Sequence, residues 1–239
     1  MSGPTAILLE NIVFGYNPRK PVLRVSKLAV QAGKRVFLYG PSGSGKTTLL
    51  GIITGVLKPQ SGACTVLGKE MTKMSAPARD RHRGEEMGYI FQSFNLIPYL
   101  TVRQNVALPC QIHKRRRQHI VARSVNKEVE RLVTRLGLES HIDHNVKKLS
   151  TGQQQRVAIA RAVIGRPSLV IADEPTSALD TDRRSEFMDL LFEVCDEAQA
   201  TLVFVSHDRS LMERFDEHLA LTDITQASAP ITELNQVPA

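Results

Sequence analysis

The sequence predicts an α/β fold built around a mostly parallel β-sheet. Three observations support this prediction. Segments with strand-like and helix-like patterns alternate along most of the 239 residues. A glycine-rich loop at residues 40–47 joins a buried apolar segment at 35–39 to a helix that begins near Lys46. The pattern then becomes purely helical from about residue 93 to 148. Because strand–helix–strand order is typical of parallel sheets buried on both faces, we expect such a sheet with an inserted helical subdomain.

The first third of the chain predicts strands on either side of a turn. Residues 5–14 and 22–38 are rich in Ile, Val and Leu in alternation, and residues 15–18 supply a Gly-Tyr-Asn-Pro turn. Residues 63–67 resemble another short strand, whereas residues 69–86 are polar and predict a loop. We expect the first strands to form an N-terminal antiparallel β subdomain.

The middle of the chain predicts a strand followed by an amphipathic helix. Residues 87–91 form a short strand-like segment. Apolar residues at three- and four-residue intervals then predict a helix that Gly137 closes. They are Val121, Val125, Val129, Leu132 and Leu136. The helical subdomain is expected to span about residues 93–155.

After this insertion the alternation resumes. A helix is predicted from about 153 to 164, a strand at 169–173, a helix at 182–199 and a strand at 201–206. Residues 225–239 are polar and predict a loosely held tail. The remaining residues, 1–224, are therefore expected to form one domain.

Composition excludes several classes of protein. With 42% hydrophobic and 23% charged residues, the chain is neither disordered nor collagen-like. No apolar run approaches the roughly 20 residues that cross a bilayer, and we find no secretory signal at the N-terminus. The three cysteines, Cys64, Cys110 and Cys195, are far apart, which favours reduced thiols in the cytosol.

The net charge of +7 peaks in a basic run at residues 114–117. We interpret this run as the solvated start of a helix, since a run of charged residues is usually exposed to solvent. A membrane-proximal role ranks second. Nucleic-acid binding ranks last, because no aromatic residues are interleaved for base stacking.

The glycine-rich loop has the full pattern of a phosphate-binding loop, G-x-x-x-x-G-K-T, between a strand and a helix. Its glycines let backbone N–H groups surround phosphates, and the helix N-terminus adds a positive dipole end. Lys46 is expected to reach the β- and γ-phosphates of ATP, and the Thr47 hydroxyl to coordinate Mg²⁺. The predicted ATP-binding residues here are Gly40, Pro41, Ser42, Gly43, Ser44, Gly45, Lys46, Thr47 and Thr48.

A second anion site is predicted at Leu149-Ser150-Thr151-Gly152-Gln153, before a strongly helical run. Ser150 is a good helix N-cap, so its hydroxyl and the helix N-terminus would face one ligand. A second phosphate-binding surface is best explained by two chains that pair head to tail, each closing the nucleotide site of the other.

This segment resembles the signature of the ATP-binding-cassette family, usually Leu-Ser-Gly-Gly-Gln. The sequence departs from that pattern at Thr151, where the family most often has Gly, and keeps Ser150 and Gly152. The resemblance covers about residues 5–222. It implies a P-loop NTPase core of the RecA-like type, ATP hydrolysis with Mg²⁺, and a dimer that encloses two ATP molecules.

The other family motifs appear in order. Asp173 and Glu174 follow a strand in a segment similar to Walker B, so Asp173 is predicted to hold Mg²⁺ and Glu174 to act as general base. The remaining matches are with the Q-loop, the D-loop, the switch histidine and the aromatic residue that stacks on adenine. They assign Gln92 to Mg²⁺ and water, Asp180 to the dimer contact, His207 to the γ-phosphate and Tyr16 to adenine.

The sequence at residues 88–98, 100–102 and 105–109 is similar to that of the MacB, LolD and FtsE branch of the family. That resemblance implies a homodimer, or a pair with a paralogue, which drives a separate transmembrane permease with or without a periplasmic adaptor. It would lie on the cytoplasmic face of the inner membrane and bind no nucleic acid. The alternatives are the ATPase of an amino-acid-type importer and, more distantly, a soluble cassette acting on ribosomes or DNA.

Overall fold

The computed structural model describes residues 3–120, 124–177 and 179–224 of the chain. The predicted tail at 225–239, the first residue of the predicted amphipathic helix, Val121, and Ala178 of the D-loop lie outside the described residues. In the described part, no helix is both long and apolar enough to cross a membrane.

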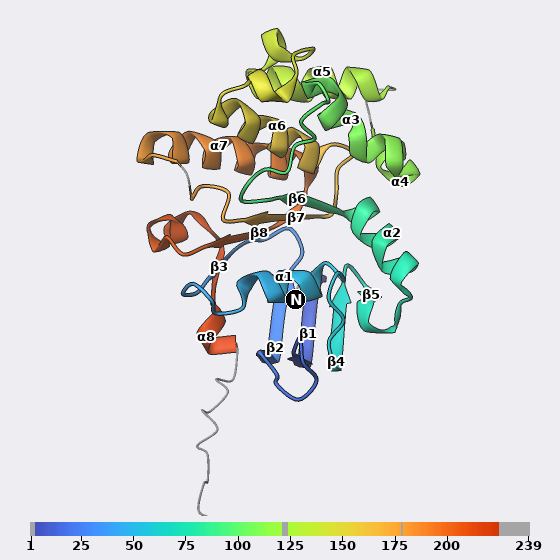
Figure 1. The fold of residues 1–239 in the computed structure, drawn as a ribbon, viewed down its shortest axis with the longest axis vertical. Helices are drawn as coiled ribbons and strands as arrows, with labels where there is room; N and C mark the ends of the chain where they lie inside the picture. The colour runs from blue at the N-terminus through green and yellow to red at the C-terminus, as the bar shows by residue number, and fades with distance from the viewer. Residues whose placement is uncertain (1–2, 121–123, 178, 225–239) are drawn as a thin grey trace, which may run out of the picture.

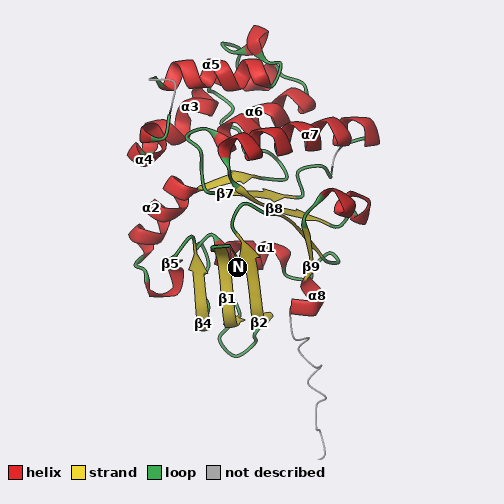
Figure 2. Cartoon of the chain, turned by 180° about the vertical axis from the view of Figure 1, so that it is seen from behind, coloured by secondary structure: helices red, strands yellow, loops and turns green. Residues whose placement is uncertain are grey.

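Four strands form an antiparallel sheet in the order β2-β1-β4-β5 (Figure 2). They are β1 (Thr5–Phe14), β2 (Leu23–Gln31), β4 (Ser61–Val66) and β5 (Lys69–Glu70). Gly33, with φ 76°, divides the strand-like segment 22–38 into β2 and a second strand at 35–39, which confirms the buried strand predicted before the glycine-rich loop. The two halves of this segment belong to different sheets.

Five strands form a parallel sheet in the order β6-β7-β8-β3-β9. They are β3 (Arg35–Tyr39), β6 (Met87–Ile90), β7 (Leu169–Asp173), β8 (Thr201–Ser206) and β9 (Glu217–Ala220). The central strands β7 and β8 are apolar runs buried on both faces, as expected of a parallel sheet. Together the two sheets confirm the predicted α/β fold with an N-terminal antiparallel part.

Helices cover the two faces of the parallel sheet (Figure 1). Helix α1 (Lys46–Ile53) lies between this sheet and the antiparallel one, in one apolar cluster with both. On the other face pack α6 (Thr151–Val163) and α7 (Thr181–Ala198), beneath the inserted helices α3 (Val102–Ile112), α4 (Lys114–Gln118) and α5 (Val125–Arg135). The short elements are η1 (Met71–Lys73), η2 (Glu139–His141), η3 (Val146–Lys148), η4 (Arg209–Arg214) and α8 (Leu221–Ile224).

The predicted loop at 69–86 is largely wrong, because Ala76–Glu86 is helix α2. In this helix only Glu86 is buried, so it lacks the apolar stripe from which helices are predicted. Polar contacts hold it instead. Arg79 donates to the carbonyl oxygens of Gly55, at 2.9 Å, and Met74, at 2.8 Å.

The interpretation of the basic run as a solvated helix start is wrong for Arg116, which is 2% exposed. Its guanidinium donates to four main-chain carbonyls that belong to different parts of the fold. They are those of Gly84, Met87, Ala162 and Ile164. The other three residues of the run are exposed. Arg116 therefore connects the helical insertion to the edge of the parallel sheet by hydrogen bonds.

Candidate nucleotide-binding site

The predicted phosphate-binding loop joins the carboxyl end of β3 to the first turn of α1. Gly43 and Gly45 have φ of 76° and 97°, in the left-handed region that favours glycine. These turns let successive N–H groups of the loop point to one side, where the N-terminus of α1 also lies. This backbone is suited to binding phosphate.

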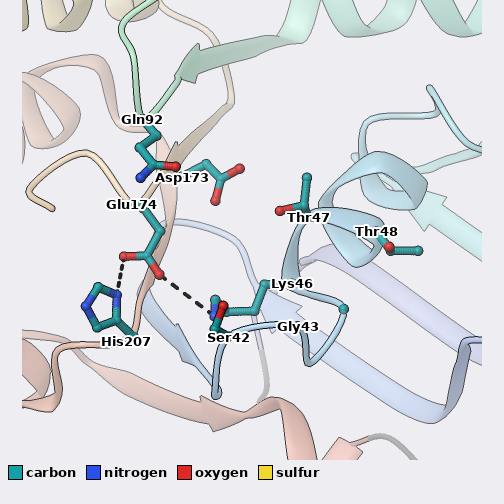
Figure 3. Close-up of a pocket in the computed structure, with 10 residues that line it drawn as sticks. Ser42, Gly43, Lys46, Thr47, Thr48, Gln92, Asp173, Glu174 and His207 are labelled. Atoms are coloured by element: carbon teal, nitrogen blue, oxygen red, sulfur yellow. Dashed lines mark hydrogen bonds and ion pairs between the residues drawn. The ribbon is translucent and has the colours of Figure 1, made fainter.

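The loop forms one wall of a cavity of about 650 Å³, and residues that are far apart in the sequence form the others (Figure 3). Gln92 follows β6, Asp173 and Glu174 lie at the end of β7, and His207 follows β8. The lining consists of Ser42, Gly43, Gly45, Lys46, Thr47, Thr48, Gln92, Asp173, Glu174 and His207. The parallel sheet thus brings the predicted side chains together at its carboxyl edge, where α/β folds bind ligands.

Lys46 is 9% exposed, and its Nζ donates to the carbonyl oxygens of Gly40, at 2.8 Å, and Pro41, at 3.1 Å. The same Nζ lies 3.8 Å from Glu174 Oε1. The ammonium group is therefore held at the base of the cavity by main-chain oxygens. Its charge faces into the cavity toward the Glu174 carboxylate, which suits it to a phosphate.

Glu174 follows β7 with φ 48°, a left-handed conformation that is uncommon for a residue other than glycine. Its N–H donates to the carbonyl of Val205 in β8, which holds this turn in place. The other carboxylate oxygen, Oε2, lies 2.9 Å from Nδ1 of His207. The strained turn and the imidazole together fix the carboxylate in the cavity.

Asp173, at the end of β7, points across the cavity toward Thr47 (Figure 3). Burial raises the pKa of its carboxyl group. Gln92, which follows β6, lines the same cavity and lies with its Nε2 3.4 Å from Ser177 Oγ. A hydroxyl, a carboxylate and an amide are the hard oxygen donors that Mg²⁺ prefers, so Thr47, Asp173 and Gln92 fit a magnesium ion.

The predicted adenine contact, Tyr16, lies next to Thr48 of α1, which lines the cavity. The hydroxyl of Tyr16 is 3.2 Å from Thr48 Oγ1, and the tyrosine side chain is 72% exposed. Its ring packs edge-on against buried Phe14, at 5.1 Å between centroids. Ser44 Oγ is buried without a hydrogen-bond partner among the described residues. An exposed ring beside the phosphate loop is accessible for stacking.

The signature residues lie outside the lining of the 650 Å³ cavity. Ser150 caps α6 in a capping box with Gln153, as the sequence predicts for a helix N-cap. Ser150, Gly152 and Gln153 line a second cavity of about 300 Å³, next to buried Leu149 and exposed Thr151. Asp180 caps α7. Within the described chain, these residues do not contribute to the lining of the 650 Å³ cavity.

One contact was not predicted. The hydroxyl of Tyr89 in β6 donates to Asp173 Oδ2, at 3.3 Å. The contact follows from the register of the two strands, because Tyr89 pairs with Ile171, two residues before Asp173, and side chains two residues apart share a face.

This fold and this site define a P-loop nucleotide-binding protein. Comparison with known proteins narrows the class. A family model described as ABC transporter matches residues 23–177. A lipoprotein-releasing system ATP-binding protein, LolD 2 of Rhodospirillum rubrum, is 39% identical over 202 residues, covering 84% of this chain and 86% of the relative. YbbA, an ABC transporter ATP-binding protein of Escherichia coli, is 40% identical over 223 residues, covering 90% and 96%.

A solved structure agrees with these relatives. The dimeric cassette MJ0796, in a post-hydrolysis state bound to ADP and phosphate, matches with a TM-score of 0.78 and 32% identity, covering 91% of this chain and 94% of that one. The chain belongs to the ABC transporter family. The predicted family is thereby confirmed, and the similarity to LolD agrees with the predicted branch.

Proposed function

We propose that this chain is the ATP-hydrolysing motor subunit of a LolD-type ABC transporter. It would pair with a second copy around two ATP molecules and drive a separate membrane subunit from the cytoplasmic face of the inner membrane. The observation that carries the proposal is the convergence of Lys46, Glu174 and His207 in one cavity. Similarity to lipoprotein-releasing ATP-binding proteins and to a dimeric cassette supports the type of transporter.

In the proposed reaction, ATP binds with its phosphates against the loop and its adenine on Tyr16. Lys46 and the loop N–H groups hold the β- and γ-phosphates. Glu174 takes a proton from the attacking water, and the contact between His207 Nδ1 and Glu174 Oε2 keeps that carboxylate oriented. When bound at Thr47, Asp173 and Gln92, Mg²⁺ would neutralise developing negative charge on the phosphates.

The separate signature surface supports a site built from two chains. A cavity that holds the phosphate-binding residues of one chain would be closed by Ser150 and Gly152 of the other, with Asp180 at the contact between them. The γ-phosphate would contact both chains, so its loss on hydrolysis would open the dimer. Opening and closing would then move the membrane subunit.

Complementation between two inactive variants tests this shared site. Lys46→Ala removes the phosphate contact, and Ser150→Phe blocks the signature surface; each variant alone is expected to lose ATP turnover. If equal amounts are mixed and allowed to re-pair, about half of the dimers contain one chain of each variant. Each mixed dimer has one intact site and one inactive site. About a quarter of wild-type turnover should therefore return if the sites act independently. A mixture no more active than the two variants alone would contradict the shared site.

A groove beside β6 supports docking of the membrane subunit. It has a volume of about 240 Å³ and lies where α2, β6 and the α3–α4 junction meet, with Phe91, Leu108 and Ile112 in its wall. Phe91 and Ile112 are exposed apolar side chains, at 37% and 63%. Exposed apolar surface in a groove is typical of a protein-binding site.

Replacing Ile112 by Asp should therefore abolish binding to native membranes, measured by co-sedimentation. The expected reason is that a carboxylate in this groove would be desolvated without a partner. Val56→Asp is the matched control, because Val56 is also 63% exposed but does not line the groove. Equal membrane binding by both variants would contradict the docking site.

A further inference from the structure

Tyr89 occupies a defined position relative to the proposed Mg²⁺ ligands. It lies in β6, the edge strand that pairs in parallel with β7, and it is in register with Ile171. Side chains two residues apart in a strand point to the same face of the sheet, so Tyr89 and Asp173 share a face. The phenol ring extends along that face toward the carboxyl end of β7.

The hydroxyl of Tyr89 donates to only one oxygen of the Asp173 carboxylate, Oδ2, at 3.3 Å. The carboxylate points across the cavity toward Thr47 (Figure 3). A carboxylate accepts hydrogen bonds at both oxygens, so a donor on Oδ2 limits its rotation and leaves Oδ1 for another ligand. Carboxylates that bind metals are commonly held by such outer hydrogen bonds.

The tyrosine ring is itself held in place. It packs against Phe91, with 4.2 Å between ring centroids and 34° between planes, and it borders the apolar cluster that contains α1. A donor on a rigid strand with a fixed ring orients its acceptor more closely than a donor on a loop. Lys46, a basic group that lines the same cavity, contacts main-chain carbonyls and Glu174 instead.

We infer that Tyr89 is a positioning residue, which orients the Asp173 carboxylate for Mg²⁺ through its hydroxyl. This inference rests on the proposed function, because it assumes that Asp173 belongs to a magnesium site. It assigns a role to a side chain outside the phosphate loop and the residues that follow β7. Its effect should appear in metal-dependent nucleotide binding and be absent from metal-free binding.

Tyr89→Phe removes only the hydroxyl, and Tyr99→Phe makes the same change on a side chain that is 77% exposed. The dissociation constant of ADP is measured by calorimetry for both variants and the wild type, once with excess Mg²⁺ and once with EDTA. We expect Tyr89→Phe to weaken binding of ADP with Mg²⁺ by on the order of 10-fold. Binding of ADP in EDTA should equal that of the wild type, and Tyr99→Phe should match the wild type in both conditions.

Three results would overturn the inference. Unchanged ADP binding with Mg²⁺ in Tyr89→Phe would show that the hydroxyl does not orient Asp173. Equal weakening with Mg²⁺ and with EDTA would show that the hydroxyl supports the fold and not the metal site. A wild-type protein that binds ADP equally with Mg²⁺ and with EDTA would refute the proposed metal site itself, and the inference with it.

Discussion

Replacing Glu174 by Gln should lower ATP turnover by about 10²- to 10⁴-fold, the contribution typical of a general base. The amide keeps the shape of the side chain but cannot accept a proton from water. Because Lys46 and the loop are unchanged, ATP should still bind. The variant should therefore accumulate as an ATP-bound dimer, since the γ-phosphate that joins the two chains is retained.

Phosphate release measures the turnover of this variant, and size-exclusion chromatography with ATP measures its dimer. Glu213→Gln is the matched control, because Glu213 is exposed on η4 and does not line the cavity. It should hydrolyse ATP like the wild type. Turnover within a few-fold of wild type in Glu174→Gln would refute the assignment of Glu174 as general base.

Replacing Arg116 by Ala should lower the free energy of unfolding by several kcal/mol. The change removes the hydrogen bonds that the guanidinium donates to four carbonyl oxygens. Each buried acceptor left unpaired costs about 1–3 kcal/mol. Arg116→Lys should recover only part of this loss, because an ammonium lacks the planar fork that reaches acceptors on several sides. Burial lowers the pKa of Arg116 to about 10, so the side chain stays charged at neutral pH.

Urea unfolding measures this effect, with Lys114→Ala as control for an exposed position of the same basic run. The control should unfold within about 0.5 kcal/mol of wild type. A midpoint for Arg116→Ala as close to wild type as that of the control would show that the buried guanidinium does not hold the insertion to the sheet.

Most of the strands and the long helices could be predicted from the sequence, because their apolar periodicity reflects which faces are buried. Helix α2 was missed since its contacts are polar, as those of Arg79 show. Burial of Arg116 was missed for a related reason. A run of four basic residues does not indicate which of them will bond to a cluster of main-chain carbonyls, because those carbonyls come from distant parts of the chain.

The nucleotide cavity was more predictable than the fold around it. The G-x-x-x-x-G-K-T pattern alone predicted the place of Lys46, whereas Asp173 and His207 were predicted from the resemblance to the motifs of the ATP-binding-cassette family. Parallel strands then bring these residues to one edge. The Tyr89 contact depends on the register of β6 and β7, which a single sequence does not reveal.

The central claim, an ATP-driven motor of a separate membrane subunit, is tested most directly by capture of partners from native membranes. Tagged Glu174→Gln protein is incubated with ATP or with ADP, and the proteins that purify with it are identified. A transmembrane protein that is recovered with ATP is the predicted result. The same sample shows whether the second ATPase is a copy or a paralogue, and whether a periplasmic adaptor accompanies it. Recovery of ribosomes or DNA without any membrane protein would contradict the proposed function.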